Sequence, residues 1–217
     1  MNKSMKLVLY RVLFIIILFL LLFTCYQNIE LKKKEKHEYL FLGDSITDRY
    51  DLQSHFSNYP IINSGIGGNK TIDILENLDN RVFKYNPDKV ILLIGINDFT
   101  HNEDVKYVYN NIDKIVTHIK KKFPKCEIYI ESIYPINDSI PLSEGQPTVN
   151  DILTRVVEEN KLIEAYCKKN NYTYIDVYSS LIDDNGKLKK RYTEDGIHLN
   201  EYGYKMTTYI IKKKVFY

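Results

Sequence analysis

The segment Val90-Ile-Leu-Leu-Ile94 is apolar at every position, which is typical of a β-strand buried on both faces. Strands of this kind belong to parallel sheets, in which helices cover both sides. From Tyr39 onward, short apolar runs alternate with segments of helical periodicity, the pattern of strand and crossover-helix units. The sequence therefore predicts an α/β fold with a mostly parallel sheet and this segment near its centre.

Further strands and helices can be placed around the central segment. The strands are predicted at 39–42, 61–63, 89–94, 128–132 and 172–177. Helices are predicted at 71–83, 104–123 and 149–169, and a last helix runs from Asn200, a plausible N-cap, to about Lys213. Apolar residues at helical spacing define the expected core faces of the first two helices: Ile72, Leu75, Leu78 and Val82 in one, and Val105, Val108, Ile112, Ile115 and Ile119 in the other.

Residues 1–36 differ from the rest of the chain in composition. Residues 7–26 are almost wholly apolar apart from Arg11, and lysines flank them on both sides. The uninterrupted run 12–23 is short for a span of about 20 residues, but a snorkelling Arg11 would extend it. We predict a membrane anchor with a basic linker in residues 1–36 and one folded domain in residues 37–217.

The fate of this N-terminal segment has alternatives. An uncleaved anchor would hold the domain at the membrane on the extracytoplasmic side. A cleaved signal peptide would instead release it, and residues 22–24 before Cys25 resemble a lipoprotein signal only loosely. The expected location is therefore membrane-anchored, or secreted if the segment is removed.

Charge and cysteine content narrow the classes of partner. The chain has a formal net charge of +2, but beyond residue 36 acidic side chains outnumber basic ones. Nucleic acid binding needs a concentrated basic face, so nucleic acid is not an expected partner. Cys126 and Cys167 lie beside apolar residues and are read as buried thiols, with a disulfide between them left open. The oligomeric state is not indicated.

Polar motifs follow the predicted strands at their ends. Gly43-Asp-Ser45 follows the first strand, Asn63-Ser-Gly-Ile-Gly-Gly68 the second and Gly95-Ile-Asn97-Asp98 the third, while Asp195-Gly-Ile-His198 precedes the last helix. Open parallel sheets bind ligands outside the carboxyl ends of their strands, so these segments are expected to converge. A serine nucleophile needs an imidazole base and a carboxylate to orient that base. Ser45, His198 and Asp195 supply these three groups.

In order and register, the four segments resemble the four sequence blocks of the SGNH (GDSL) hydrolases, over about residues 39–204. The resemblance implies a flavodoxin-like, three-layer α/β/α fold with a five-stranded parallel sheet, and hydrolysis of esters or thioesters without a cofactor or metal. It makes Ser45 the nucleophile, His198 the general base and Asp195 its orienting carboxylate. It also assigns an oxyanion hole to the backbone N–H groups of Ser45 and Gly68 and the side-chain amide of Asn97.

Other interpretations of the same residues fit less well. A dinucleotide fingerprint would need a third glycine where Lys70 stands. The nucleophile elbow of α/β-hydrolases fails because Thr47 occupies its last position. A metal hydrolase using Asp195 and His198 has no clear further ligands. Asp44 and Asp98, next to the key residues, are predicted to be structural hydrogen-bond acceptors, and His101 is a weaker site candidate near Asn97.

The substrate is predicted from location and family analogy. The favoured substrate is a small-molecule or glycan ester, with a small O-acyl group, chiefly acetyl, on carbohydrate or cell-envelope glycan. A lysophospholipase or thioesterase for longer acyl chains and an O-acyltransferase are alternatives, and a non-catalytic glycan-binding module is a more remote one. The segment 134–148, rich in proline and polar residues, is expected to line the acyl or alcohol pocket.

Overall fold

The computed structural model describes residues 3–34 and 38–217, and the chain divides into two compact units, Met1–His37 and Glu38–Tyr217. In the first unit, α1 (Lys3–Lys34) is one continuous helix. Its apolar side chains from Val12 to Phe23 are about half exposed or more. Across the described residues, no helix combines the length and the apolar character that a membrane crossing requires.

The second unit is built on a sheet of five strands that pair only in parallel. The strands are β1 (Tyr39–Gly43), β2 (Ile61–Gly65), β3 (Lys89–Leu93), β4 (Glu127–Glu131) and β5 (Thr173–Ile175). Their order, β2-β1-β3-β4-β5, is that of flavodoxin-like folds. The predicted fold class is confirmed, and the apolar segment that begins at Val90 lies in the middle strand.

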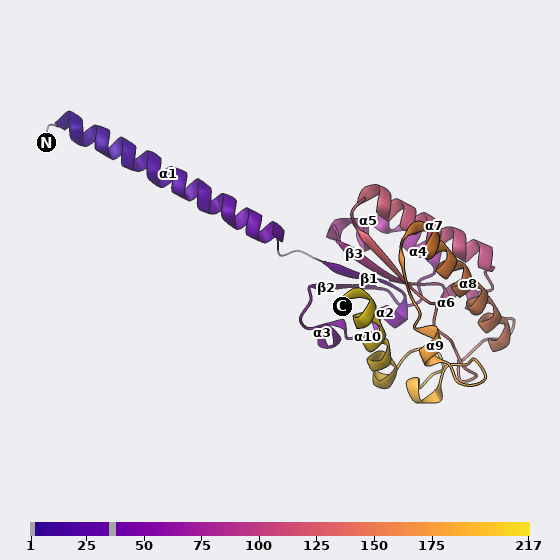
Figure 1. The fold of residues 1–217 in the computed structure, drawn as a ribbon. Helices are drawn as coiled ribbons and strands as arrows, with labels where there is room; N and C mark the ends of the chain where they lie inside the picture. The colour runs from indigo at the N-terminus through magenta and orange to yellow at the C-terminus, as the bar shows by residue number, and fades with distance from the viewer. Residues whose placement is uncertain (1–2, 35–37) are drawn as a thin grey trace. The chain divides into compact units, whose positions relative to one another are not determined.

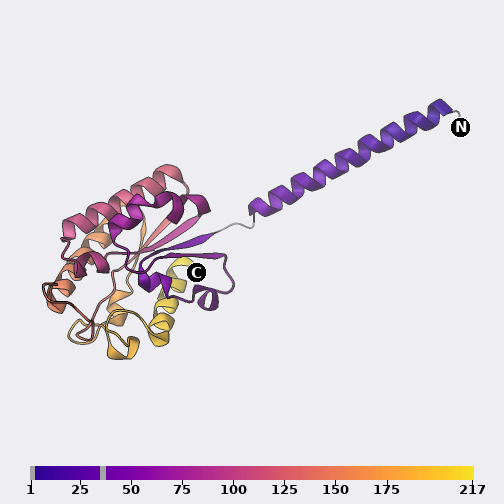
Figure 2. The ribbon, with the colours of Figure 1, turned by 180° about the vertical axis from the view of Figure 1, so that it is seen from behind.

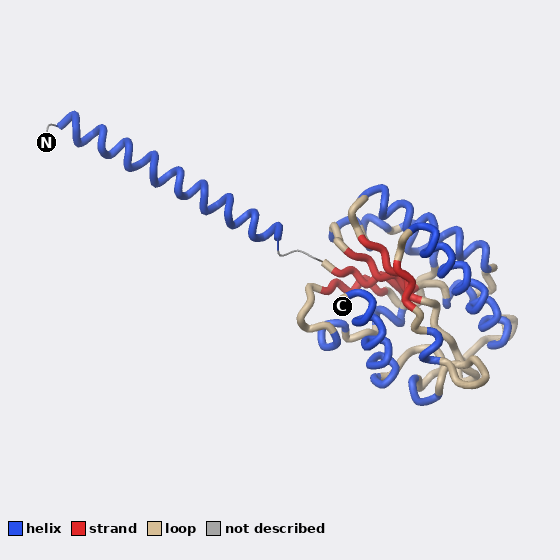
Figure 3. Tube along the Cα trace, viewed as in Figure 1, coloured by secondary structure: helices blue, strands red, loops and turns tan. Residues whose placement is uncertain are grey.

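Helices cover both faces of this sheet (Figures 1 and 2). One face carries α4 (Thr71–Glu76), α5 (Leu78–Arg81), α7 (Val105–Lys122) and α8 (Val149–Asn170). The opposite side carries α2 (Ser45–Asp48), α3 (Leu52–His55), α9 (Tyr178–Leu181) and α10 (Glu201–Val215). Figure 3 shows the strands as the middle layer between them. Short helical segments complete the unit: α6 (Ile96–Thr100), η1 (Phe83–Tyr85) and η2 (Lys190–Tyr192).

The prediction of one helix over residues 71–83 is wrong in detail. The chain breaks at Asn77, where φ is −120° and ψ is 25°, and again at Val82, where φ is −133° and ψ is −54°, which leaves α4, α5 and η1. The Asn77 side-chain amide donates to the Asp73 carbonyl oxygen at 2.9 Å, and such local bonds compete with helix continuation. The core face also differs, because Ile74 and Leu78 are buried while Ile72 and Leu75 are half-buried.

The final helix docks against the first loop after β1. Asn200 is its N-cap, as predicted, and accepts hydrogen bonds from the backbone N–H groups of Tyr202 and Gly203. The ring of Tyr204 stacks on that of Tyr50 at a centroid distance of 4.4 Å, and its hydroxyl donates to the Ile46 carbonyl oxygen at 2.8 Å. The two ends of the domain are thereby held together.

The two cysteines of this unit are buried free thiols. Burial raises the pKa of both Cys126 and Cys167 to about 12, so neither thiol is ionised near neutral pH. The disulfide that the sequence left open is not formed.

Candidate active site

Ser45 is placed by the turn from β1 into α2. It is the first residue of α2, and the preceding Asp44 is the N-cap whose side chain accepts from the Ile46 N–H at 2.9 Å. β1 lies between β2 and β3, which is where the order of strands reverses and where doubly wound folds bind ligands. The Ser45 residue is largely buried, at 9% exposure.

Asp195 and His198 belong to one tight turn before α10. One oxygen of Asp195 accepts from the backbone N–H groups of Ile197 and His198, at 3.1 and 2.8 Å. Its other oxygen lies 2.6 Å from His198 Nδ1, and His198 Nε2 lies 2.8 Å from Ser45 Oγ. An ionised carboxylate accepts the Nδ1 proton, which leaves Nε2 free to accept from the serine hydroxyl. The structure thus brings the three predicted residues together in a continuous relay.

The surroundings keep Asp195 ionised. Its partial burial opposes ionisation, but the hydrogen bonds from His198 and from the backbone outweigh it and lower the pKa of Asp195 to about 2. Arg49 adds a longer contact, 3.7 Å from the carboxylate, between exposed side chains. The carboxylate can therefore stabilise a positive charge on the imidazole ring at neutral pH.

The predicted oxyanion residues lie on the two adjacent loops. A Cβ on Gly67 would sit 3.9 Å from Ser45 Cβ, so the glycine loop passes beside the serine. Gly68 is exposed and has a φ of +76°, which favours glycine. Asn97, in α6, donates one amide hydrogen to the Asn69 carbonyl oxygen at 2.9 Å. A primary amide has a second N–H, so Asn97 retains a donor for a ligand.

Asp44 and Asp98 act as hydrogen-bond acceptors within the loops. Asp98 accepts from the Thr71 N–H at 2.9 Å and from the Thr71 hydroxyl at 2.6 Å. Burial raises the pKa of Asp98, and it raises the pKa of Asp44 to about 7. His101 is exposed, and its Nδ1 lies 2.7 Å from the Asn97 carbonyl oxygen and 3.2 Å from the Thr100 hydroxyl oxygen, so it contacts its own loop.

The segment 134–148 packs on the turn that carries His198. The Asn137 N–H donates to the Gly196 carbonyl oxygen at 2.9 Å, and a Cβ on Gly196 would lie 2.4 Å from the Ile140 nitrogen. Farther along, Gln146 donates to the Thr100 carbonyl oxygen at 3.0 Å. The segment therefore connects the turn of His198 to the loop of Asn97. Its role in lining an acyl or alcohol pocket stays a prediction.

Sequence reasoning missed a buried arginine behind the site. Arg81 donates to Gly43, Ser64 and Asn69, at the ends of β1 and β2 and in the glycine loop. A signal was present, because Arg81 interrupts the apolar face between Leu78 and Val82. In the described part of the chain, no group of three or more His, Cys, Asp or Glu side chains is arranged to hold a metal ion.

The fold and this constellation are those of a serine hydrolase. A sequence profile of the GDSL-like lipase/acylhydrolase family matches residues 41–206, and the chain belongs to this family. It is thus a serine hydrolase that acts on ester bonds.

Individual relatives differ in name and in how much of their length the chain matches. Subunit alpha2 of platelet-activating factor acetylhydrolase IB from Rattus norvegicus is 26% identical over 79% of this chain and 73% of its own length. An N-acylneuraminate cytidylyltransferase of Escherichia coli is 26% identical over 82% of this chain, but over 42% of its own length. A solved structure from Streptococcus pneumonia, described by reference to platelet activating factor, is 32% identical with a TM-score of 0.73, covering 81% of this chain and 82% of that one.

Proposed function

We propose that Ser45, His198 and Asp195 form the catalytic triad of an esterase that removes small acyl groups. The observation that carries this proposal is the relay from Asp195 through His198 to Ser45, with atoms 2.6 and 2.8 Å apart. His198 takes the hydroxyl proton as Ser45 attacks the ester carbonyl, and then gives that proton to the departing alcohol. Water, activated by the same imidazole, next cleaves the acyl-serine and releases the acid.

The oxyanion that forms during each attack is proposed to bind three donors. These are the backbone N–H groups of Ser45 and Gly68 and the free amide hydrogen of Asn97. Each such donor is typically worth about 3 kcal/mol in the transition state. The exposure of Gly68 and the position of the glycine loop beside Ser45 support this assignment.

The favoured acyl group is acetyl. One relative is named an acetylhydrolase, which supports a short acyl chain. For the alcohol, the favoured class is carbohydrate or cell-envelope glycan. The relative named N-acylneuraminate cytidylyltransferase aligns with this chain over less than half of its length, so a related domain occurs in an enzyme of sugar metabolism.

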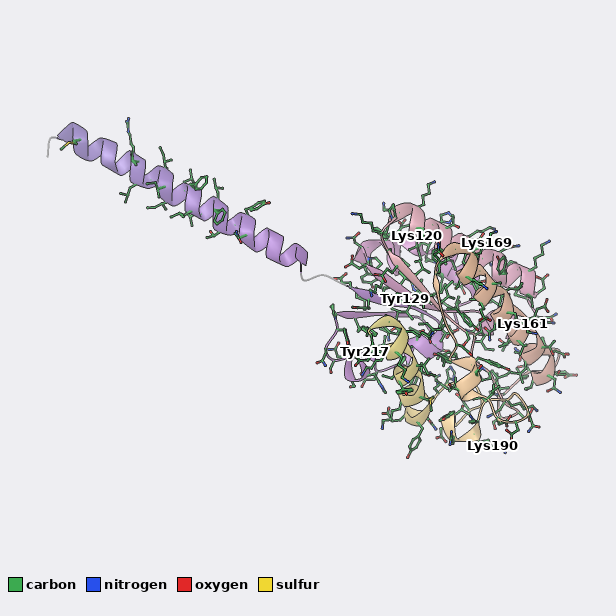
Figure 4. The ribbon with its side chains drawn as sticks, viewed as in Figure 1. Lys120, Tyr129, Lys161, Lys169, Lys190 and Tyr217 are labelled. Carbon is green, nitrogen blue, oxygen red and sulfur yellow. The ribbon has the colours of Figure 1, made fainter. Side chains whose placement is uncertain are left out.

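A surface groove formed by the segments before and after the Asp195–His198 turn also supports a carbohydrate alcohol, although none of the three proposed catalytic residues lines it. Its volume is about 840 Å³, and it lies along η2 and the first half of α10, on either side of the Asp195–His198 turn in the sequence. Aromatic and charged side chains line it, a combination that suits sugar rings and hydroxyl groups. Lys190, one of them, lies at the surface of the domain (Figure 4). The remaining residues that line the groove are Arg191, Tyr192, Glu194, Asn200, Tyr202, Lys205, Met206 and Tyr209.

A chain-length series tests the acyl preference. The full-length protein is assayed with 4-nitrophenyl esters from acetyl to dodecanoyl, and Ser45→Ala serves as the blank. A steep fall in kcat/KM beyond butanoyl supports deacetylation. A rise with chain length contradicts it and favours a lysophospholipase or thioesterase.

Two further experiments address the remaining alternative functions. Added sugar acceptors distinguish an O-acyltransferase, because acyl transfer would produce acylated sugar in place of free acid. A fluorophosphonate should form a covalent adduct at Ser45. Absence of both labelling and hydrolysis would contradict the proposed triad and favour a non-catalytic glycan-binding module.

The location of the enzyme stays a prediction from the sequence. We propose that residues 1–36 keep the hydrolase domain at the outer side of a membrane. Retention of the full chain in the membrane fraction after alkaline carbonate washing would support an anchor. Recovery of a shortened chain from the medium would indicate cleavage instead.

A further inference from the structure

Arg81 is a buried cation whose acceptors are all neutral. It ends α5 and its residue is 4% exposed. Its guanidinium donates to Ser64 Oγ at 3.2 Å and to the Gly43 carbonyl oxygen at 2.8 Å, and it also contacts the Ser64 carbonyl oxygen and Asn69 Oδ1. Among residues 38–217, no carboxylate forms an ion pair with it. Burying a charge is costly, and the carboxylates that favour the charged form of Arg81, Asp73 and Asp44 among them, lie beyond ion-pair distance, so its hydrogen bonds to the loops must offset much of that cost.

The acceptors of Arg81 lie at the ends of two neighbouring strands and in the loop between the strands and α4. Gly43 is the last residue of β1 and directly precedes the turn of Ser45. Ser64 is the penultimate residue of β2, and Asn69 follows Gly68 in the glycine loop. One planar group therefore joins the loop that carries the serine to the loop that carries Gly68.

The hydrogen-bond network of Arg81 reaches the third loop, which carries Asn97, through Asn69. While its side chain accepts from Arg81, its carbonyl oxygen accepts from the Asn97 amide at 2.9 Å. Asn97 follows β3, so the network spans the ends of three adjacent strands, β2, β1 and β3. Gly43 is bound from two sides, because its carbonyl oxygen also accepts from the Ile66 N–H at 3.2 Å.

We propose that Arg81 is a positioning residue whose guanidinium sets the relative placement of the three loops that carry the oxyanion donors. It touches neither substrate nor reacting atoms. Oxyanion donors act only within a narrow range of distance and direction, so a small displacement of one loop lowers the rate without abolishing binding. This inference rests on the proposed function, because it assigns a role within the same oxyanion hole.

The chemistry of the side chain explains why an arginine is needed. A guanidinium presents several N–H donors in a rigid plane, which suits acceptors that lie in different directions. A lysine keeps the charge but has one compact ammonium group on a flexible stem. Arg81→Lys should therefore hold fewer of the acceptors at once, and the glycine loop should lose its fixed position.

The test compares Arg81→Lys with the wild-type full-length chain. We expect kcat for 4-nitrophenyl acetate to fall about 10- to 100-fold, less than the loss of a whole oxyanion donor, while KM stays within about threefold. The rate of fluorophosphonate labelling at Ser45 should fall in parallel, because the phosphonyl oxygen occupies the same hole. The matched control is Arg155→Lys, since Arg155 also donates to a loop carbonyl oxygen and an asparagine, at 3.0 and 2.8 Å.

A double-mutant cycle separates positioning from general destabilisation. In an Asn97→Ala background, Arg81→Lys should lower kcat by a smaller factor than in the wild-type chain, since one of the three donors that Arg81 places is then absent. Should Arg81→Lys fail to fold, Asn69→Ala replaces it, because this variant removes only one acceptor of the guanidinium. A fall in kcat of about fivefold or more supports the inference.

Different results would contradict the positioning role of Arg81 and the proposed function. Suppose that the wild type is active but Arg81→Lys, or Asn69→Ala where that variant is used, changes kcat by less than about twofold. This result contradicts the positioning role and leaves the proposed function intact. Equal losses in Arg81→Lys and Arg155→Lys, or additive losses with Asn97→Ala, contradict the positioning role as well. A wild-type chain that neither hydrolyses esters nor reacts with the fluorophosphonate contradicts the proposed function itself.

Discussion

His198 Nδ1 lies 2.6 Å from the carboxylate of Asp195, three residues earlier in the same turn. That carboxylate also accepts from the His198 backbone N–H, so one aspartate orients both the ring and the main chain of the base. The ring is thereby held with Nε2 toward Ser45 before substrate arrives. Preorganisation of this kind is expected to appear in kcat more than in KM.

Replacing Asp195 by asparagine should lower kcat by about 10³- to 10⁴-fold, because a neutral amide neither fixes the required tautomer nor stabilises an imidazolium. Steady-state kinetics on 4-nitrophenyl acetate measure the loss. Asp176→Asn is the control, because Asp176 accepts from Ser179 in a similar local turn. A loss below about tenfold in Asp195→Asn would contradict the role of the carboxylate.

Replacing Asn97 by alanine should lower kcat by about 10²- to 10³-fold, the usual effect of removing one oxyanion donor. The fluorophosphonate labelling rate should fall with it, because the developing charge loses the same hydrogen bond. Asn150→Ala, on the exposed side of α8, should leave both rates unchanged. Full activity of Asn97→Ala would remove this side chain from the proposed hole.

Gly196→Ala should impair both folding and catalysis. Gly196 has a φ of +86°, and an added Cβ would lie 2.4 Å from the Ile140 nitrogen, so the turn of His198 must shift. Gly186→Ala is the matched control, because its φ is +73° but its Cβ would meet only ordinary contact at 3.9 Å. We expect the control to cost about 1 kcal/mol of unfolding free energy and Gly196→Ala about 3 kcal/mol or more.

In the same pair, only Gly196→Ala should lower kcat, by about 100-fold, because a 1 Å displacement of a catalytic group has an effect of this size. Denaturant unfolding and ester hydrolysis measured on both variants check the two parts. Equal behaviour of the two alanine variants would show that the contact with Ile140 is unimportant.

Glu159 in α8 should make stability fall as the pH rises. Its side chain is fully buried, and neither carboxyl oxygen has a hydrogen-bond partner among the described residues. Burial, reinforced by the charge of Asp98, raises the pKa of Glu159 to about 8, whereas the pKa of a free glutamate is about 4.3. Between these values the folded chain keeps a proton that the unfolded chain has released, so each pH unit lowers stability by up to about 1.4 kcal/mol.

Glu159→Gln should therefore reduce the slope of unfolding free energy against pH between about pH 5 and 8. Some slope remains, because burial also raises the pKa of Asp44 and of Glu131 to about 7. The exposed Glu144→Gln should leave the slope unchanged. Denaturant titrations at several pH values provide the measurement, and identical slopes in wild type and Glu159→Gln would refute the expectation.

The sequence predicted well those elements in which the type of each residue follows from whether it is buried. The run from Val90 is apolar throughout because both faces of its strand are covered, so strand and centrality follow from composition alone. The break at Asn77 was not predictable in the same way, because it depends on one side chain competing with the helix backbone.

The candidate site also has one part that the sequence predicted and one part that it did not. The four motifs predicted that Ser45 and His198 meet, and they do so across 153 positions of sequence. The network of Arg81 was not predicted, because two of its four acceptors are backbone carbonyl oxygens, whose positions follow from strand register and leave no trace in residue type. Only the charge on an otherwise apolar helix face marked Arg81 as unusual.

The stacking of Tyr204 on Tyr50 has a consequence for biosynthesis. Ser45 is translated well before His198 and before α10, the helix that carries Tyr204. A nascent chain can therefore assemble most of its sheet while carrying an unactivated hydroxyl. If the proposed triad is correct, ester cleavage must wait until α10 has been synthesised and has docked, so a shorter nascent polypeptide leaves acylated molecules around it intact.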